Sequence, residues 1–428
     1  MQSICLENKN VLTKRKASIT DIIINVSLFL FIFLVLCFPR MLQIVKLVII
    51  IILLLFGYIV KKKVMKLDNR VIITTSIYLF LAAFWTLVGI GNGNRDKFDY
   101  AKVNFLWYFL WIFLFKIMDR GHLKIIYKGI IAASIYILTY NFAMVFMIQR
   151  GMDTSFLRQL EATPDASIYT DFIHLSATNT SMLMVTMPFI ASCLIYNKEI
   201  KHPFLMTILL ILNIVLMFMS GRRILMLLAL LVVFALGFIP FSKEKIVQKR
   251  RKKLRMILYL GLFIVLTLYM DTIEGLYGRF MTAFTQETVR QDQMSILLEE
   301  FQKQPIFGTG YGKVLTIIPE YEKISIVEMT YHLMLYNTGI FGIILLGLYI
   351  LMVITYLAIE IRKRNDLNYI LVACLAVYLC GIIGTATNPY IGSSFDFHIF
   401  QMLPIFAIQL SRTKNVKKEI TDLELVNQ

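Results

Sequence analysis

Twelve stretches of predominantly apolar residues divide the chain, and polar or charged segments separate them. A helix that crosses the hydrocarbon core of a bilayer needs roughly 20 such residues, because its backbone groups must pair within the segment. The stretches are residues 21–38, 41–60, 71–90, 103–118, 124–148, 173–196, 203–220, 224–241, 256–270, 331–358, 367–387 and 397–411, of which the fourth, ninth and twelfth are short. This pattern predicts an all-α, polytopic membrane protein with about 12 transmembrane helices, forming one integral membrane domain over residues 1–428.

The basic residues between the apolar stretches predict the orientation of the helices. The densest group is KEKIVQKRRKKLR at residues 243–255, which we expect to be a cytoplasmic loop because such a cluster is hard to translocate. An even number of spans places the basic residues at 61–63 and 362–364 on the same side, and an odd number would separate them. We therefore expect both termini to be cytoplasmic, and the first apolar stretch, which lacks a small-residue cleavage site, to remain as a helix.

Composition narrows the class of protein further. A chain with 58% hydrophobic and 17% charged residues exposes too much apolar surface for a soluble globular domain. The net charge of +17 is explained by basic loops that face anionic lipid, and nucleic acid is not an expected partner. High lysine and isoleucine usage is typical of an AT-rich bacterial genome, so the expected location is the plasma membrane of a bacterium. The five cysteines fall in predicted helices or in the inner N-terminal segment, which predicts no disulfide framework.

Two outer loops are long enough to hold a substrate site: residues 149–172 and the large extracytoplasmic loop at 271–330. In the second loop, apolar residues recur at helical spacing and predict an amphipathic helix at 290–304, which Pro305 ends. The next segment, PIFGTGYG, contains Gly308 and Gly310. It lacks the strand, helix and Lys-Ser/Thr of a phosphate-binding loop, so it is interpreted either as a tight turn or as a turn that also shapes a substrate pocket.

Four segments, in this order, resemble the superfamily of O-antigen and capsular polysaccharide polymerases (Wzy-type) and O-antigen ligases. They are FMSGRRILMLL at 218–228, Arg290 fifteen residues before Pro305, the PIFGTGYG segment itself, and EMTYHLMLYNTGIFG at 328–342. The similarity extends from the seventh to the tenth predicted helix. The rest of the chain is similar to the family in helix number and hydropathy alone.

The resemblance implies a glycosyltransferase whose active site faces outward. Such a polymerase joins undecaprenyl-pyrophosphate-linked oligosaccharide repeat units during the synthesis of capsule, exopolysaccharide or O-antigen. It implies no metal and no cofactor, because the leaving group is already on the lipid. Its partners would be the lipid-linked oligosaccharides, membrane lipid, and a chain-length regulator or flippase. An O-antigen-type ligase remains an alternative, as does a lipid-linked oligosaccharide flippase or transporter, although we find neither an internal repeat nor charges in the middle of most spans.

The leaving pyrophosphate calls for fixed cations near the outer surface, and arginine binds phosphate oxygens through two parallel hydrogen bonds. Arg223 occupies the position that matches the family pattern. Arg222 stands where the family usually has serine, so it either adds a second phosphate contact or anchors the helix at the interface. Arg290 is the third candidate, with solvation of its helix as the alternative.

The acceptor hydroxyl needs a general base. The matching position in the ligases is usually histidine, and here it is Glu328, with His332 one turn later; this difference favours a polymerase over a ligase. Tyr311 and Tyr331 are candidates for stacking on sugar rings, beside Gly308 and Gly310, although tyrosines are common at membrane interfaces. Lys46, inside the second apolar stretch, is interpreted as reaching toward the lipid headgroups. No histidine pair has the spacing of a helical metal site, so no metal site is predicted.

Overall fold

The computed structural model describes residues 18–60, 65–159, 166–169, 172–175, 177–268, 288–313, 329–363, 368–391 and 394–412. Over these residues the fold is helical, apart from one short antiparallel hairpin of β1 (Ala166–Tyr169) and β2 (Phe172–Leu175). The helices of the first half are α1 (Ile19–Cys37), α2 (Gln43–Leu54) with its continuation η1 (Leu55–Val60), α3 (Asn69–Gly91), α4 (Lys97–Ala101), η2 (Lys102–Trp107), α5 (Tyr108–Ile117), α6 (His122–Gln149), α7 (Ser155–Gln159), η3 (Thr178–Met182) and α8 (Leu183–Tyr196). Those of the second half are α9 (Pro203–Met219), α10 (Arg223–Phe238), α11 (Lys245–Leu268), α13 (Thr288–Lys303), α14 (Thr330–Lys363), α15 (Asn368–Thr385), η4 (Asp396–His398) and α16 (Ile399–Arg412).

Seven helical segments of the described chain are long and apolar enough to cross a membrane, which indicates a membrane-embedded protein. They are Ile19–Cys37, Gln43–Val60, Asn69–Gly91, Phe98–Ile117, His122–Gln149, Thr178–Tyr196 and Thr330–Lys363. Three shorter apolar helices, α9, α10 and α15, add to them. Each of the twelve apolar stretches of the sequence contains a helix, while the number that spans a bilayer stays a prediction.

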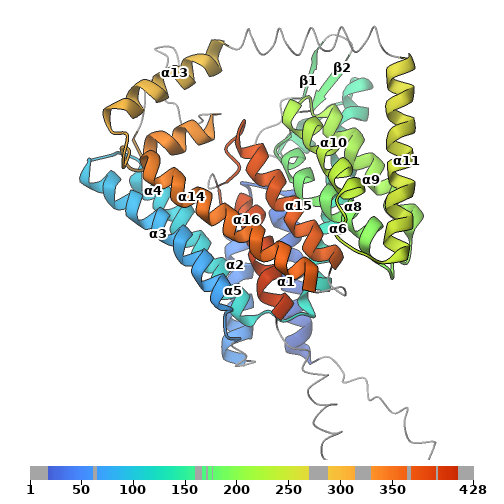
Figure 1. Ribbon diagram of the computed structural model, residues 1–428, viewed down its shortest axis with the longest axis horizontal. Helices are drawn as coiled ribbons and strands as arrows, with labels where there is room; N and C mark the ends of the chain where they lie inside the picture. The colour runs from blue at the N-terminus through green and yellow to red at the C-terminus, as the bar shows by residue number, and fades with distance from the viewer. Residues whose placement is uncertain are drawn as a thin grey trace, which may run out of the picture.

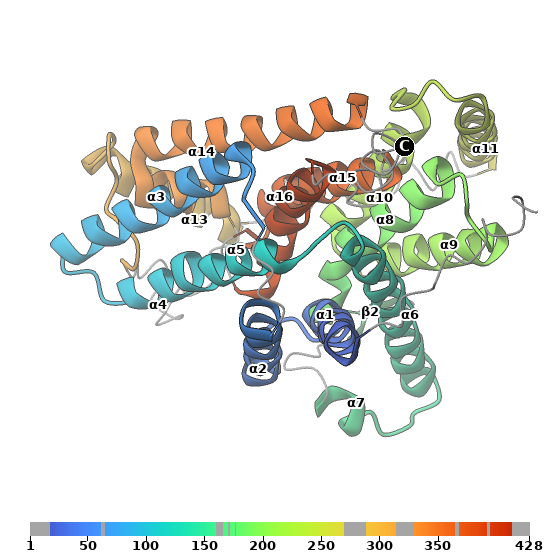
Figure 2. The same ribbon diagram turned by 90° about the horizontal axis from the view of Figure 1, so that it is seen from below.

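Helix α8 lies at the centre of one half of the bundle. All its residues except Leu194 are buried, and α6, α9, α10 and α15 pack against it. The other half consists of α3, α4, α5 and α14, with α16 next to α14, while α1 and α2 lie along a third side (Figures 1 and 2). A helix enclosed in this way is apolar on every face, which explains why its sequence shows no amphipathic pattern.

Helix α14 is broken near its start, and the segment after α13 fills the break. Gly339 has φ 65° and ψ −173°, so the helical hydrogen bonds are interrupted there. The N–H of Ile340 instead donates to the carbonyl of Pro305 at 2.9 Å, and the N–H of Gly310 donates to the carbonyl of Asn337 at 2.9 Å. The 305–310 segment therefore satisfies backbone groups on both sides of the break, as an apolar surrounding requires.

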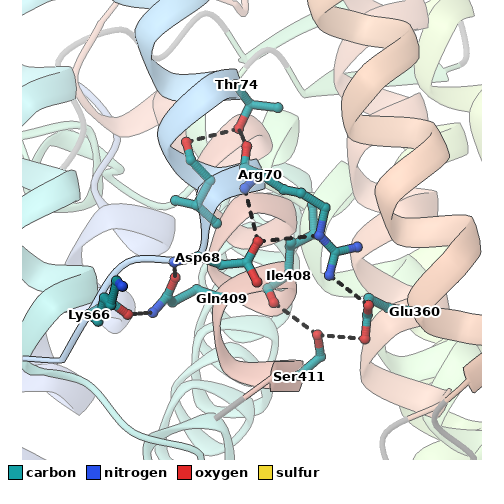
Figure 3. Close-up of polar contacts among 9 residues, drawn as sticks. Lys66, Asp68, Arg70, Thr74, Glu360, Ile408, Gln409 and Ser411 are labelled. Atoms are coloured by element: carbon teal, nitrogen blue, oxygen red, sulfur yellow. Dashed lines mark hydrogen bonds and ion pairs between the residues drawn. The ribbon is translucent and has the colours of Figure 1, made fainter.

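One end of the bundle is closed by a network of polar contacts among three helix ends (Figure 3). Asp68 accepts the N–H of Arg70 at the start of α3, and the Arg70 guanidinium reaches Glu360 near the end of α14 at 2.8 Å. Ser411 of α16 donates to the second oxygen of Glu360 at 3.0 Å. The alternating orientation predicted from the sequence places these three helix ends on one side, and the structure brings them together. We call this side the inner end.

The basic segment at 243–255 differs from the predicted loop. From Lys245 it forms the first turns of α11, which continues to Leu268 as one helix. The periodicity of apolar residues alone could not show this, since the buried residues of these turns are Val247 and Arg251, of which only the first is apolar. Helix α13, at Thr288–Lys303, covers the segment where the sequence predicts the amphipathic helix.

Candidate functional site

The turn between α1 and α2 lies at the opposite end of the bundle, which we call the outer end. Two of its residues have left-handed backbone conformations without being glycine: Arg40 at φ 67° and Leu42 at φ 53°. Each such residue costs about 1–2 kcal/mol relative to an ordinary conformation. The surrounding contacts must therefore hold the turn in place.

Asp396 provides these contacts. Its carboxylate accepts hydrogen bonds from the backbone N–H of Arg40 at 2.7 Å, from Nε2 of Gln43 at 2.7 Å and from Nζ of Lys46 at 2.6 Å. Lys46 also donates to the carbonyl of Phe38 at 2.6 Å. Burial raises the pKa of the Asp396 carboxyl from its ordinary value, and the three donors act in the opposite direction. The carboxylate thus ties the turn to the 394–398 segment.

Arg40 and Arg222 lie close to each other at this end. Partial burial lowers the pKa of the Arg40 guanidinium from its ordinary value, and repulsion from Arg222 lowers it further. The Arg40 guanidinium lies over the ring of Phe397, 5.5 Å from its centroid, and Arg222 donates to the hydroxyl of Ser181. Within the described part of the chain, neither guanidinium forms a salt bridge with a carboxylate. The charge of Asp396 offsets part of this repulsion at Arg40. Two guanidinium groups that repel each other and form no salt bridge of their own among these residues make an arrangement that a bound anion would stabilise further.

The GRR sequence explains how Arg222 reaches this position. Gly221, at φ 64°, ends the α9 side of the turn, and Arg222 then precedes the first residue of α10 in extended conformation. Arg223 begins α10 and is exposed. The sequence singled out Arg223 as the family position, whereas in the structure it is the charge of Arg222 that acts on Arg40.

Two small cavities lie along α14. The first, of about 40 Å³, has a mainly apolar surface, and the polar residues in its lining are Tyr78, Asn104, Tyr311 and Thr338. The second, of about 10 Å³, is also mainly apolar, and the polar residues in its lining are Tyr331, Tyr349, Tyr378, Thr385 and Gln401. Both are also lined by Met334, Leu346 and Ile391, so they are neighbours. Their volumes suit water-sized groups rather than a sugar ring.

One turn of chain links the cavities to the arginines. Ile391 lines both cavities, and the preceding residue, Tyr390, lies close enough to Arg40 to influence its pKa. The N–H of Ile391 donates to the Thr385 hydroxyl at 3.1 Å, which fixes this turn to the end of α15. The predicted glycan residues Tyr311 and Tyr331 thus lie in neighbouring cavities on the same side of the protein as the arginines.

The two tyrosines are held by different contacts. Tyr311 stacks on Tyr100, with ring centroids 5.0 Å apart and planes 6° apart, and burial raises the pKa of its hydroxyl. Tyr331 donates its hydroxyl proton to the carbonyl of Ile382 at 2.7 Å. Both rings are therefore held by contacts within the protein.

Gly308 and Gly310 pack against protein backbone. An added Cβ would lie 2.5 Å from the carbonyl oxygen of Asn337 at Gly308, and 2.2 Å from the backbone nitrogen of Gly89 at Gly310. Their φ angles of 65° and 76° also favour glycine. The structure thus gives both glycines a packing role between α3 and α14. The sequence left two interpretations of this turn open. In the structure the turn is tight, and its residue Tyr311 also lines a cavity.

The remaining predicted residues are only partly covered. Glu328 lies outside the described residues, which resume at 329. Arg290 lies in the first turn of α13, in a part of that helix whose side chains are outside the described ones. His332 follows Tyr331 in the first turn of α14 and is half-buried. The described residues contain no group of three His, Cys, Asp or Glu side chains that could hold a metal ion.

The sequence interpretation missed the contribution of Arg40, Lys46 and Asp396. Lys46 was expected to reach the headgroups, and that prediction is wrong, because its side chain is 0% exposed and paired with Asp396, which is also 0% exposed. A signal was present. A lysine inside an apolar stretch and an aspartate in the last outer turn are opposite charges that a membrane environment forces to pair.

Comparison with protein-family models and with curated proteins finds no match for this chain. The resemblance to the O-antigen polymerase and ligase superfamily therefore rests on the four sequence segments alone, and membership stays a proposal.

Proposed function

We propose that this protein is a membrane-embedded polysaccharide polymerase, which joins undecaprenyl-pyrophosphate-linked oligosaccharide repeat units at its outer end. The observation that carries the proposal is the juxtaposition of Arg40 and Arg222. Two guanidinium groups without a carboxylate salt bridge among the described residues, on the same side of the protein as Tyr311 and Tyr331, suit a ligand that joins a diphosphate to sugars. In this proposal twelve helices cross the bacterial plasma membrane and both termini are cytoplasmic.

In the proposed reaction each of these groups has a specific role. The acceptor hydroxyl oxygen attacks the anomeric carbon of the donor, and a new glycosidic bond forms as the bond to the pyrophosphate oxygen breaks. The electron pair of that bond leaves with the undecaprenyl pyrophosphate, whose growing negative charge Arg40 and Arg222 stabilise. The proton of the acceptor passes to a general base, for which Glu328 and His332 are the candidates.

The placement of the two arginines favours chemistry on the lipid headgroup. Arg222 immediately precedes α10 and donates to Ser181, while Arg40 lies in the turn that Asp396 holds, so both cations are positioned before the substrate arrives. Such preorganisation lets a charge stabilise the transition state without reorganising at the moment of reaction. Tyr311 and Tyr331 are the candidate contacts for the sugars.

The test is chain elongation in cells that carry Arg222→Ala in place of the native protein. We expect repeat units to accumulate singly on the lipid carrier, and the long polymer to be lost by at least about 100-fold, the order expected for removing one preorganised charge donor. The matched control is Arg150→Ala, which removes an exposed outer cation at the end of α6 that lies over the Phe146 ring. Polymer of normal length in the Arg222 variant, at normal protein level, would overturn the proposal.

The same cells distinguish the alternative functions. A polymerase defect leaves single repeat units in the outer leaflet, where an added impermeant glycosidase can reach them. A flippase or transporter defect leaves them in the inner leaflet, protected from the enzyme. A ligase defect leaves full-length polymer on the lipid carrier.

A further inference from the structure

In the first three turns of α11, two arginines contact the rest of the protein and the lysines are exposed. Arg250 donates to the carbonyls of Leu194 at 3.2 Å and Asn197 at 2.6 Å, and Arg251 donates to the carbonyl of Phe238 at 2.7 Å. These carbonyls belong to the last turns of α8 and α10 or follow them directly, where no intrahelical donor remains. Arg251 is only 6% exposed. The arginines therefore belong to the protein's own packing.

The lysines of the same turns all face away from the protein. Lys245, Lys249, Lys252 and Lys253 are exposed. Their spacing of four, seven and eight residues places them on one face of the helix. Within the described part of the chain, their ammonium groups form no salt bridge and no hydrogen bond, whereas nearby Glu244 is already paired with Lys198. This face has a dense positive charge that the described protein leaves uncompensated.

The lysine face changes to an apolar surface within one turn. Met256, 64% exposed, and Ile257, 53% exposed, continue the same stripe toward the membrane-predicted part of the helix. Helix α11 stands at the edge of the bundle, packed on one side against α8 and α10 (Figure 1). A cationic face that becomes apolar along the helix axis matches the layer of lipid phosphates and the hydrocarbon below it.

We propose that this lysine face binds the headgroup phosphates of anionic phospholipids, with the acyl chains lying along Met256 and Ile257. The apolar continuation distinguishes a lipid from a soluble polyanion, which would leave these two side chains in water. Lysine suits the task because its ammonium is a flexible point charge, whereas the planar arginines are used where fixed carbonyls must be capped. The inference does not depend on the proposed polymerase activity.

The experiment compares lipid retention by the purified full-length protein. The lysine variant is K245Q/K249Q/K252Q/K253Q. Its matched control, K124Q/K128Q/K201Q/K363Q, removes four exposed lysines from the same inner end, in other helices and loops. Each protein is reconstituted in nanodiscs of phosphatidylcholine mixed with an equal part of phosphatidylglycerol, and the retained lipid is counted by native mass spectrometry.

We expect the native protein and the control to retain phosphatidylglycerol, and the lysine variant to retain at least roughly tenfold less at low salt. High salt should reduce this difference, since exposed charges are screened. Equal retention by the lysine variant and the native protein would overturn the proposal. An equal loss in the control would also overturn it, because the effect would then follow net charge rather than this face.

A second variant separates lipid binding from packing. Arg251→Gln removes the cap on Phe238, so it should lower the thermal stability equally in phosphatidylcholine alone and in the mixture, without changing the lipid retained. If Arg251→Gln abolished lipid retention while the lysine variant did not, the assignment of the two residue types would be reversed and the proposal lost.

Discussion

Lys46 and Asp396 are 350 residues apart in sequence, yet Nζ and Oδ1 lie 2.6 Å apart with both side chains fully buried. Through this contact the last outer turn of the chain holds the first one, and Arg40 with it. A buried charge that loses its partner is far more costly than an exposed one. The pair is therefore the point at which the stability of the outer end can be tested.

Asp396→Leu should destabilise the protein by about 3–5 kcal/mol, because Lys46 is left charged and buried without an opposite charge, with the Phe38 carbonyl as its remaining acceptor. Lys46→Met should be comparably harmful, since it leaves the carboxylate unpaired. The double variant should recover much of the loss, because no uncompensated charge remains. Thermal unfolding in nanodiscs measures all three. Losses that simply add in the double variant would show that the two residues act independently.

Gly339→Ala should destabilise the protein by more than about 2 kcal/mol, since the residue has φ 65° and its Cβ would lie 2.2 Å from the Ile306 carbonyl oxygen. Gly347→Ala is the control, because it lies in the same helix and its Cβ would meet nothing within 4 Å. That change should be neutral or slightly stabilising. A Gly339 variant as stable as the control would mean that the break in α14 is not needed for the fold.

The sequence predicts much of this architecture, because a membrane imposes one requirement on every spanning segment. Apolar length predicts the helices, and basic residues predict which helix ends share a side of the membrane, which stays a prediction. Backbone hydrogen bonds between distant segments leave no such pattern in the sequence. Nothing in PIFGTGYG shows that its carbonyls complete a broken helix at Gly339, since the partner residues are defined only by the fold.

The candidate site was less predictable for a similar reason. Arg222 stood out because it adjoins the family position, but Arg40 lies outside every motif and acquires its place only through Asp396. Side-chain pairing between distant turns depends on how the helices pack. Composition and spacing therefore find the candidate cations of the site without showing which two of them meet.

Glu360→Ala should destabilise the protein by about 3 kcal/mol, since it removes one of the two carboxylates that pair with the largely buried Arg70 and also removes the acceptor of Ser411. The comparison is Glu300→Ala, whose partner Lys303 is exposed on α13. Removing that pair should change little, because solvent screens it. Chemical denaturation monitored by tryptophan fluorescence measures both. Equal effects would indicate that the inner network contributes no more than a surface pair.

Removing Arg40 should separate stability from activity. In the protein without substrate, the Arg40 and Arg222 guanidinium groups repel each other, so Arg40→Gln relieves that repulsion and should leave the melting temperature unchanged or slightly higher. The same change should reduce chain elongation strongly, because the diphosphate loses one of its two cations. Arg40→Lys should restore part of the activity, since it returns the charge without the planar fork.

Elongation and melting temperature are measured on the same preparations, with Arg150→Gln as the control for an outer cation. A melting temperature that falls in parallel with activity would show that Arg40 supports the fold of the turn and is not held there for an anion.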